Sequence, residues 1–271
     1  MTANVLQKGH ATSVRHVLEL RRPMSAWQAA VARLVAFIIF AGLWEWGATS
    51  ANSILIPTFT ETVKALFETM FVTSDVWPAL WVSNIPMLIG YGISVAISVP
   101  LGLAMARWSV IDRMLNPITA LMLALPIAPL VPVVLVALGM GMTPKVVIII
   151  LFSWVFITTN VRAGTRQVDY RLVEMARSFG ASEREVWFRI LIPGAIPAVF
   201  AGLRIGLGRA FAGMVIVELI MLPVGIGAQL MDYRGDFKAD LLYATTIVVV
   251  MEAVLLAIAM QAFERHLIRW K

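Results

Sequence analysis

The sequence EMARSFGASEREVWFRILIP, residues 174–193, interrupts an otherwise strongly apolar chain. It contains the charged residues Glu174, Arg177, Glu183, Arg184, Glu185 and Arg189. Charged side chains that face lipid tails carry a large desolvation cost. The stretch is therefore predicted to lie outside the bilayer, in a connection between two membrane spans.

The composition of the whole chain is that of an integral membrane protein. Of its 271 residues, 60% are hydrophobic and 14% are charged, and the mean hydropathy is +0.84. The absence of cysteine excludes disulfides, thiolate metal sites and thiol catalysis. The net charge of +6 fits basic loops beside anionic lipid, so we expect no nucleic-acid partner.

Six apolar segments approach the length of about twenty residues that a membrane-spanning helix requires. They cover residues 30–48, 80–105, 115–138, 146–161, 196–221 and 241–262. An even number of spans places both termini on one side, and most arginines of the loops fall on that side, so both termini are predicted to be cytoplasmic. The first apolar run lacks a cleavage pattern and is expected to remain as an anchor. The predicted organisation is a cytoplasmic tail, 1–29, and one all-α membrane domain, 30–271.

Two short amphipathic helices joined at a glycine are predicted between about residues 170 and 193. The first helix would place Leu172, Val173, Ala176 and Phe179 on one face, and the second Val186, Trp187 and Ile190. Gly180 would end the first helix in a left-handed conformation. Ser182 and Glu185 form a capping-box pattern for the second helix, which Pro193 would stop. Periodicity alone leaves two interpretations: a cytoplasmic loop resting on lipid, or a docking element for another protein.

The order of residues in this segment closely resembles the EAA motif of ABC importer permeases. The matching positions are Glu174, Met175, Ala176, Gly180, Ile190 and Pro193, with Met175 in place of the first alanine. Three further stretches resemble other parts of the family: ILIPTFTETVKAL, ALPIAPLVPVVLVALGMGMTPK, and GLRIGLGRAF with VELIMLPVGIGAQL. Residues 50–271 are similar to permeases of the nitrate, sulfonate, taurine and bicarbonate branch of binding-protein-dependent importers.

This resemblance implies a type I ABC importer permease fold with six transmembrane helices, whose EAA segment is a coupling helix seated in a groove of a cytoplasmic ATPase dimer. The implied coupling residues are Glu174, Ala176, Phe179, Gly180, Ala181, Val186, Trp187, Ile190 and Pro193. A phosphate-binding loop requires a lysine directly after a glycine, and none of the five lysines has that position. ATP and magnesium are therefore expected on the ATPase. This chain is expected to be no enzyme and to bind no cofactor or metal. The other implied partners are an extracytoplasmic substrate-binding protein and a second copy of the permease in the bacterial inner membrane, in contact with lipid. Small residues of the fifth span, Gly202, Gly206, Gly208, Ala212 and Gly213, would permit the close helix approach of this homodimer.

Polar residues and prolines within the spans are candidates for the translocation pathway. They are Ser83, Asn84, Pro126, Pro129, Arg204, Arg209 and Glu218. Glu218 would either brace the outer loop at 223–227 or face the pathway, and Arg204 and Arg209 are alternatively a structural pair. Pro126, Pro129 and Pro132 are expected to break the backbone ladder of the third span. Pro86 occupies a position where the family commonly has arginine, which weakens the case for a small inorganic anion.

Two other classes of function compete with the permease interpretation. A self-contained secondary transporter would couple protons through Glu218 or Glu252, but it would be expected to have inverted repeats, which this sequence lacks. A membrane-embedded enzyme is disfavoured because all three histidines, His10, His16 and His266, lie near the chain ends. The solute is expected to be a small organic or inorganic anion or a vitamin-like compound, with most of the selectivity in the binding protein.

Overall fold

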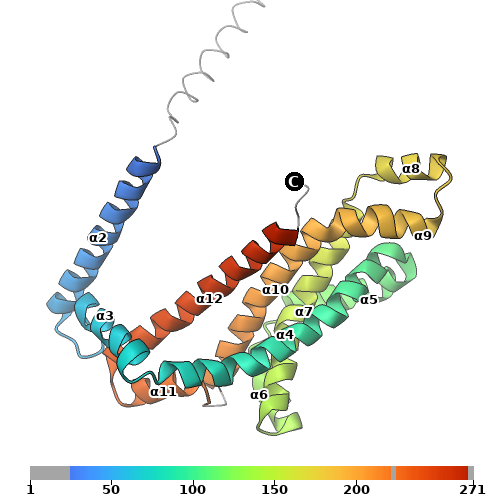
Figure 1. Cartoon of the computed structure of the whole chain (residues 1–271). Helices are drawn as coiled ribbons and strands as arrows, with labels where there is room; N and C mark the ends of the chain where they lie inside the picture. Colours follow the sequence, from blue (N-terminus) through green and yellow to red (C-terminus); the bar gives the residue numbers. More distant parts are fainter. Residues whose placement is uncertain (1–24, 221–223, 268–271) are drawn as a thin grey trace, which may run out of the picture. The chain divides into compact units, whose positions relative to one another are not determined.

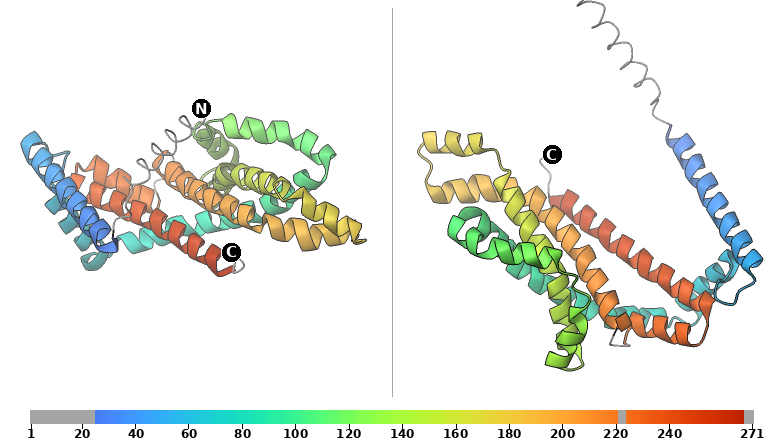
Figure 2. Two further views of the ribbon diagram at one scale, coloured as in Figure 1. Left: turned by 90° about the horizontal axis from the view of Figure 1, so that it is seen from above. Right: turned by 180° about the vertical axis from the view of Figure 1, so that it is seen from behind.

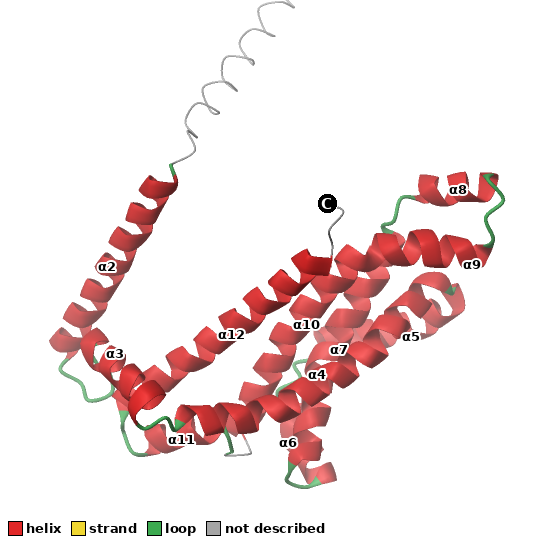
Figure 3. Cartoon of the chain, in the orientation of Figure 1, coloured by secondary structure: helices red, strands yellow, loops and turns green. Residues whose placement is uncertain are grey.

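The computed structural model of the chain describes residues 25–220 and 224–267, and within these ranges every regular element is a helix (Figures 1 and 3). The described residues divide between two compact units, 1–60 and 61–271. Most of the predicted cytoplasmic tail, residues 1–24, lies outside the described residues. The prediction of an all-α membrane protein is confirmed.

The first unit is built around α2 (Ala26–Ala51), which covers the first predicted span. Ser25 opens this helix with a capping box formed with Gln28. Near its other end, the Glu45 carboxylate accepts hydrogen bonds from the backbone N–H and the hydroxyl of Thr60 at 3.0 and 3.1 Å. Thr60 lies in the first turn of α3 (Phe59–Phe67), so Glu45 satisfies a backbone N–H that a helix start otherwise leaves unpaired.

The core of the second unit consists of α4 (Val76–Arg107), α7 (Met142–Arg166) and α10 (Ile192–Ile220), which lie side by side (Figures 1 and 2). Glycines of α10 make this packing close. A Cβ added to Gly206 would lie 2.4 Å from Ile157 of α7, and one added to Gly213 would lie 2.9 Å from Phe152. These glycines therefore serve contacts within the chain.

This packing corrects one expectation from the sequence. Gly202, Gly206 and Gly213 had been assigned to a dimer interface, but all three face α7 of the same chain. Of the other two small residues, Gly208 has open space around it and Ala212 is half-buried. The three glycines that face α7 therefore give no support to the predicted homodimer.

Five helices of the described part are long and apolar enough to cross a membrane: α2, α4, α7, the helix Glu183–Ile220 that contains α10, and Ala239–His266 of α12 (Ala239–Leu267). The predicted third span is divided into α5 (Ser109–Ala124) and α6 (Leu130–Leu138). Pro126 and Pro129 lie in the break between them, as expected. Pro132 does not break the chain, because it sits in the first turn of α6, where a helix tolerates proline. The count of six spans and the side of the termini remain predictions.

The remaining elements connect these helices. The π-helical turn η1 (Glu68–Val72) extends α3 and leads toward α4, and α11 (Ile226–Gly235) precedes α12. At the opposite end of the bundle, α8 (Tyr170–Ser178), α9 (Glu183–Val186) and the π-turn η2 (Trp187–Leu191) join α7 to α10. Helices α8 and α9 form a hairpin that projects beyond the core (Figures 1 and 2).

Candidate functional site

The segment 170–193, called the coupling segment below, has the predicted local structure up to its last turns. Gly180 follows α8 with a left-handed φ of +82°, a conformation in which only glycine avoids a steric penalty. The Ala181 N–H then donates to the Ala176 carbonyl at 3.0 Å, which closes the end of the helix. The capping box of Ser182 and Glu185 is formed in both directions and starts α9.

The predicted stop at Pro193 is wrong. One continuous helix of 38 residues runs from Glu183 to Ile220, through η2 and into α10. In the π-turn the Ile192 N–H donates to the Trp187 carbonyl, five residues back. Pro193 falls in the first turn of α10, directly after this widened turn, where its missing N–H is accommodated. The second helix of the coupling segment is therefore an extension of α10.

The apolar side chains of the coupling segment divide into two groups. Val173 and Val186 are buried within the chain, at 5% and 1% exposure, and both line the cavity described below. Phe179 is 86% exposed, and Leu172 and Met175 are also exposed, so these three present an apolar surface on α8. The predicted docking face thus loses Val186, which is unavailable to a partner in this conformation.

The other predicted coupling residues have the following positions. Glu174 is exposed and its backbone carbonyl accepts a bond from the Ser178 hydroxyl, while Ala176 and Ala181 are half-buried. Trp187, Ile190 and Pro193 are half-buried in η2 and the start of α10. Gly180 has no atom within 4 Å of the position of an added Cβ, so the turn is open to its surroundings.

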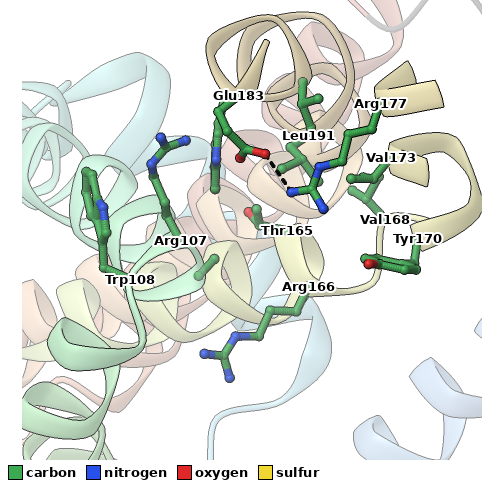
Figure 4. Close-up of a pocket in the computed structure, with 13 residues that line it drawn as sticks. Arg107, Trp108, Thr165, Arg166, Val168, Tyr170, Val173, Arg177, Glu183 and Leu191 are labelled. Atoms are coloured by element: carbon green, nitrogen blue, oxygen red, sulfur yellow. Dashed lines mark ion pairs between the residues drawn. The ribbon is translucent and has the colours of Figure 1, made fainter. Parts of the chain in front are cut away.

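A cavity of about 480 Å³ lies beneath the hairpin, between the end of α4 and the coupling segment (Figure 4). Arg177 of α8 and Glu183 of α9 form an ion pair of 2.7 Å at its edge, and both side chains are about half exposed. An exposed pair of this kind contributes only about 0–1 kcal/mol. The hairpin therefore depends more on Gly180, the capping box and the two buried valines than on this ion pair.

A second cluster of charges joins α5 to α7 at the same end of the bundle. Asp112 accepts from Arg162 at 2.5 Å and from Arg166 at 2.9 Å. Asp112 precedes the predicted third span, 115–138, and the hydrogen bond from Arg162 is the main reason that its pKa is lowered from the usual value. The carboxylate consequently stays ionised. It fixes α5, the first part of the divided third span, to α7.

At the other end of the bundle, Glu218 is the centre of a buried network that comprises Ser83, Lys145, Glu218, Ile226 and Gly227. One carboxylate oxygen forms an ion pair of 2.7 Å with Lys145, and the other accepts from the Ser83 hydroxyl at 2.7 Å and the Gly227 N–H at 3.1 Å. The Ser83 oxygen in turn accepts from the Ile226 N–H at 2.9 Å. The Glu218 network thus ties α4, α7, α10 and the start of α11 together.

These contacts favour one of the two roles considered for Glu218, that of bracing the outer loop. Its side chain is 1% exposed and braces the loop that enters α11, of which residues 221–223 lie outside the described part. Sequence reasoning missed Lys145, which directly precedes the predicted span 146–161 and is buried in the first turn of α7. A signal was present, because a lysine directly before the apolar run 146–152 requires either solvent or a buried acidic partner.

The remaining polar candidates also have partners within the chain. The Asn84 side-chain amide donates to Glu252 of α12, whose second carboxylate oxygen is buried and has no hydrogen-bond partner among the described residues. Arg204 pairs with Glu264 at 2.5 Å, and the Arg209 guanidinium lies 4.3 Å from the centre of the Phe156 ring. Arg204 and Arg209 therefore have separate structural contacts, on α12 and α7 respectively.

Residues 98–270, which contain the coupling segment and every member of the Glu218 network except Ser83, match the family described as binding-protein-dependent transport system inner membrane component. The chain belongs to this family. It is thus a multi-pass membrane permease component of an ABC importer, as the EAA-like segment indicated. The family resemblance inferred from the sequence is confirmed.

Relatives within the family carry transport names. The chain is 27% identical over 237 residues to the taurine transport system permease protein TauC of Escherichia coli (strain K12), covering 84% of this chain and 86% of TauC. It is 27% identical over 252 residues to the putative aliphatic sulfonates transport permease protein SsuC of the same organism, covering 92% and 95%. A chain of the inward-facing MetNI methionine ABC transporter has a TM-score of 0.56 at 18% identity, covering 73% of this chain and 96% of that chain. The last similarity shows the shared permease fold.

Proposed function

We propose that this permease moves solute by alternating access and that its coupling segment receives the closing movement of a separate, cytoplasmic ATPase dimer. The observation that carries the proposal is the continuity of α9, η2 and α10. A displacement of α9 would pass along one helix into the core of the membrane domain, without a hinge loop in between. In this proposal ATP and magnesium bind to the ATPase, and the permease itself is no enzyme.

The exposed surface of α8 supports docking into a protein groove. Leu172, Met175 and Phe179 offer apolar side chains, and the open turn at Gly180 lets another backbone come close. Charged residues surround this surface, and such a rim orients a partner while the apolar centre supplies most of the binding energy. Val173 and Val186 would keep the segment attached to the membrane helices as it moves.

The proposed assembly contains two permease chains, two ATPase chains and one substrate-binding protein in a bacterial inner membrane. A closed two-fold interface needs only a self-complementary surface. The printed names of relatives refer to taurine, aliphatic sulfonates and riboflavin. We therefore propose a small organic anion or a vitamin-like compound as the solute, delivered at the end of the bundle that carries α11.

Proton coupling through Glu218 finds no support in its surroundings. Both carboxylate oxygens are held by donors in the core, and the side chain is closed off from solvent. Its burial and its contacts with three other helices favour a structural role for Glu218. Glu252 has Asn84 as a partner, which favours packing between α4 and α12.

The coupling role is tested with Phe179→Asp, because this exposed side chain can be changed without disturbing the core. Phe237→Asp is the matched control: Phe237 is similarly exposed, at the α11 end, and its left-handed φ of +57° is one that aspartate tolerates. Recovery of the ATPase with affinity-tagged permease should fall about tenfold or more for Phe179→Asp, the effect of losing an apolar anchor. The control should recover the ATPase like the parent protein. Equal recovery with both variants would contradict docking through α8.

A further inference from the structure

Two arginines, Arg107 beside the coupling segment and Arg184 within it, carry charges that no carboxylate neutralises within the described residues. The Arg107 guanidinium lies 5.3 Å from the centre of the Trp108 ring and 4.8 Å from that of Trp187. Arg184 lies 5.9 Å from the centre of the Phe188 ring. Neither arginine forms an ion pair in the part of the chain that the structure describes, whereas Arg162, Arg166, Arg177 and Arg189 nearby all do. Both positive charges are therefore available to an anion.

These two arginines flank one apolar groove between the end of α4 and the helix that contains α9 and η2. The groove, called the Arg107 groove below, has a volume of about 520 Å³. Its apolar walls are formed by Pro100, Leu103, Ala104, Trp187, Phe188 and Ile192. A ligand for this groove must combine an anionic group with a substantial apolar part.

The groove continues along an exposed apolar stripe on α4. Ile93, Ile97, Pro100, Ala104 and Arg107 follow one another at alternating intervals of four and three residues, which places them on one face. Ile93 and Ile97 are exposed, so none of the described helices of the second unit covers the stripe there. From Arg107 the stripe runs back into the apolar part of α4, where lipid tails surround a spanning helix.

We propose that the Arg107 groove binds an anionic phospholipid. Its phosphate accepts hydrogen bonds from Arg107 and Arg184, and its acyl chains lie against the groove walls and the stripe of Ile97 and Ile93. The two tryptophans fit this position, since tryptophan is enriched where the bilayer meets water, and basic pockets between membrane helices are known to select anionic headgroups. A bound lipid would contact η2 directly, between α4 and the coupling segment.

The geometry favours lipid over other anionic ligands. A free phosphate would use the two arginines and leave the apolar walls and the stripe without a partner. An acidic protein surface would reach the arginines, but it could not follow the stripe of α4 into the hydrocarbon region. Only a molecule with a charged head and long apolar tails matches the whole surface. This inference concerns the permease chain alone, so it does not depend on the proposed coupling to an ATPase.

The test measures lipid binding to the purified full-length permease by native mass spectrometry, titrating phosphatidylglycerol and phosphatidylcholine separately. The parent protein should bind phosphatidylglycerol in preference to phosphatidylcholine. Arg107→Gln with Arg184→Gln should weaken phosphatidylglycerol binding about 25-fold, from roughly a fivefold effect of each basic residue beside an anionic headgroup. The matched control is Arg113→Gln with Arg171→Gln, which removes the same charge outside the groove and should leave binding within about twofold of the parent.

Leu103→Trp provides a second variant, which fills the groove and keeps both arginines, and it should also reduce lipid retention. Three results would overturn the proposal. The first is equal affinity of the two lipids for the parent protein. The second is an equal effect of the groove pair and the control pair. The third is displacement of bound phosphatidylglycerol by inorganic phosphate at concentrations that merely saturate the arginines, which would identify the site as one for free phosphate.

Discussion

Replacing Lys145 by methionine should destabilise the permease strongly, because it leaves the Glu218 carboxylate in the core without its cation. Lys145 and Glu218 are 4% and 1% exposed, and the ion pair between them is 2.7 Å long. Removing one partner of a buried ion pair costs about 3–5 kcal/mol in free energy of unfolding. The methionine side chain has a similar length and is apolar, so it should create neither a large cavity nor a new polar contact.

The double variant Lys145→Met with Glu218→Gln separates the charge effect from other causes. A glutamine oxygen can still accept from Ser83 and Gly227, and no uncompensated charge remains. Replacement of a complete buried pair is often nearly neutral. The double variant should therefore be at least about 2 kcal/mol more stable than the sum of the two single changes predicts.

The measurement is the free energy of unfolding in mixed micelles, from reversible denaturation by increasing fractions of sodium dodecyl sulfate, for the parent, both single variants and the double variant. Arg234→Met is a suitable control, since Arg234 is an exposed cation in the last turn of α11 and forms no ion pair among the described residues. The reasoning is refuted if Lys145→Met costs less than about 1 kcal/mol, below the range for a broken buried pair. It is also refuted if the effects of the two single changes simply add.

Three further predictions concern the loops and the assembly. Gly225→Ala should weaken the Glu218 network by about 1–3 kcal/mol in the same unfolding assay, because φ is +68° and the new Cβ would lie 2.2 Å from the Ser83 hydroxyl, whereas Gly235→Ala has open space and should be nearly neutral. Gly180→Val should separate ATP hydrolysis from solute uptake in reconstituted vesicles, while Gly180→Asn, which tolerates a left-handed φ, should largely preserve coupling; normal coupling in the valine variant would count against the role of this turn. Mass measurement of the solubilised complex should give two copies of this permease for two ATPase chains, and a different second permease would contradict the homodimer.

Features fixed by neighbouring residues could be predicted from the sequence. The capping box of Ser182 and Glu185, the left-handed turn at Gly180 and the break at Pro126 each depend on a few adjacent backbone groups. Pro193 was misjudged because its effect depends on the hydrogen bonds of the preceding turn. Pro193 would have interrupted the hydrogen bonds of a regular α-turn before it, but the π-turn accommodates this proline.

Features that depend on how helices face one another could not be predicted. Lys145 and Glu218 are 73 positions apart, and they meet only because α7 and α10 pack closely. The glycines of α10 belong to the same contact. The sequence shows that this helix has a face of small residues, but it does not show whether the helix beneath that face belongs to the same chain or to another copy.

The π-turn η2 also gives the permease an adjustable helix register. A π-turn accommodates one residue more than an α-turn, and each residue of an α-helix advances it by about 1.5 Å and turns it by about 100°. Conversion of η2 into regular α-helix would therefore rotate α9 by about 100° around the axis of α10 and extend it by about 1.5 Å. The hairpin that bears Phe179 would then point in a new direction while the membrane part of α10 kept its contacts with α7. Such a step is discrete, because a backbone hydrogen bond is made either four or five residues back and has no stable position in between.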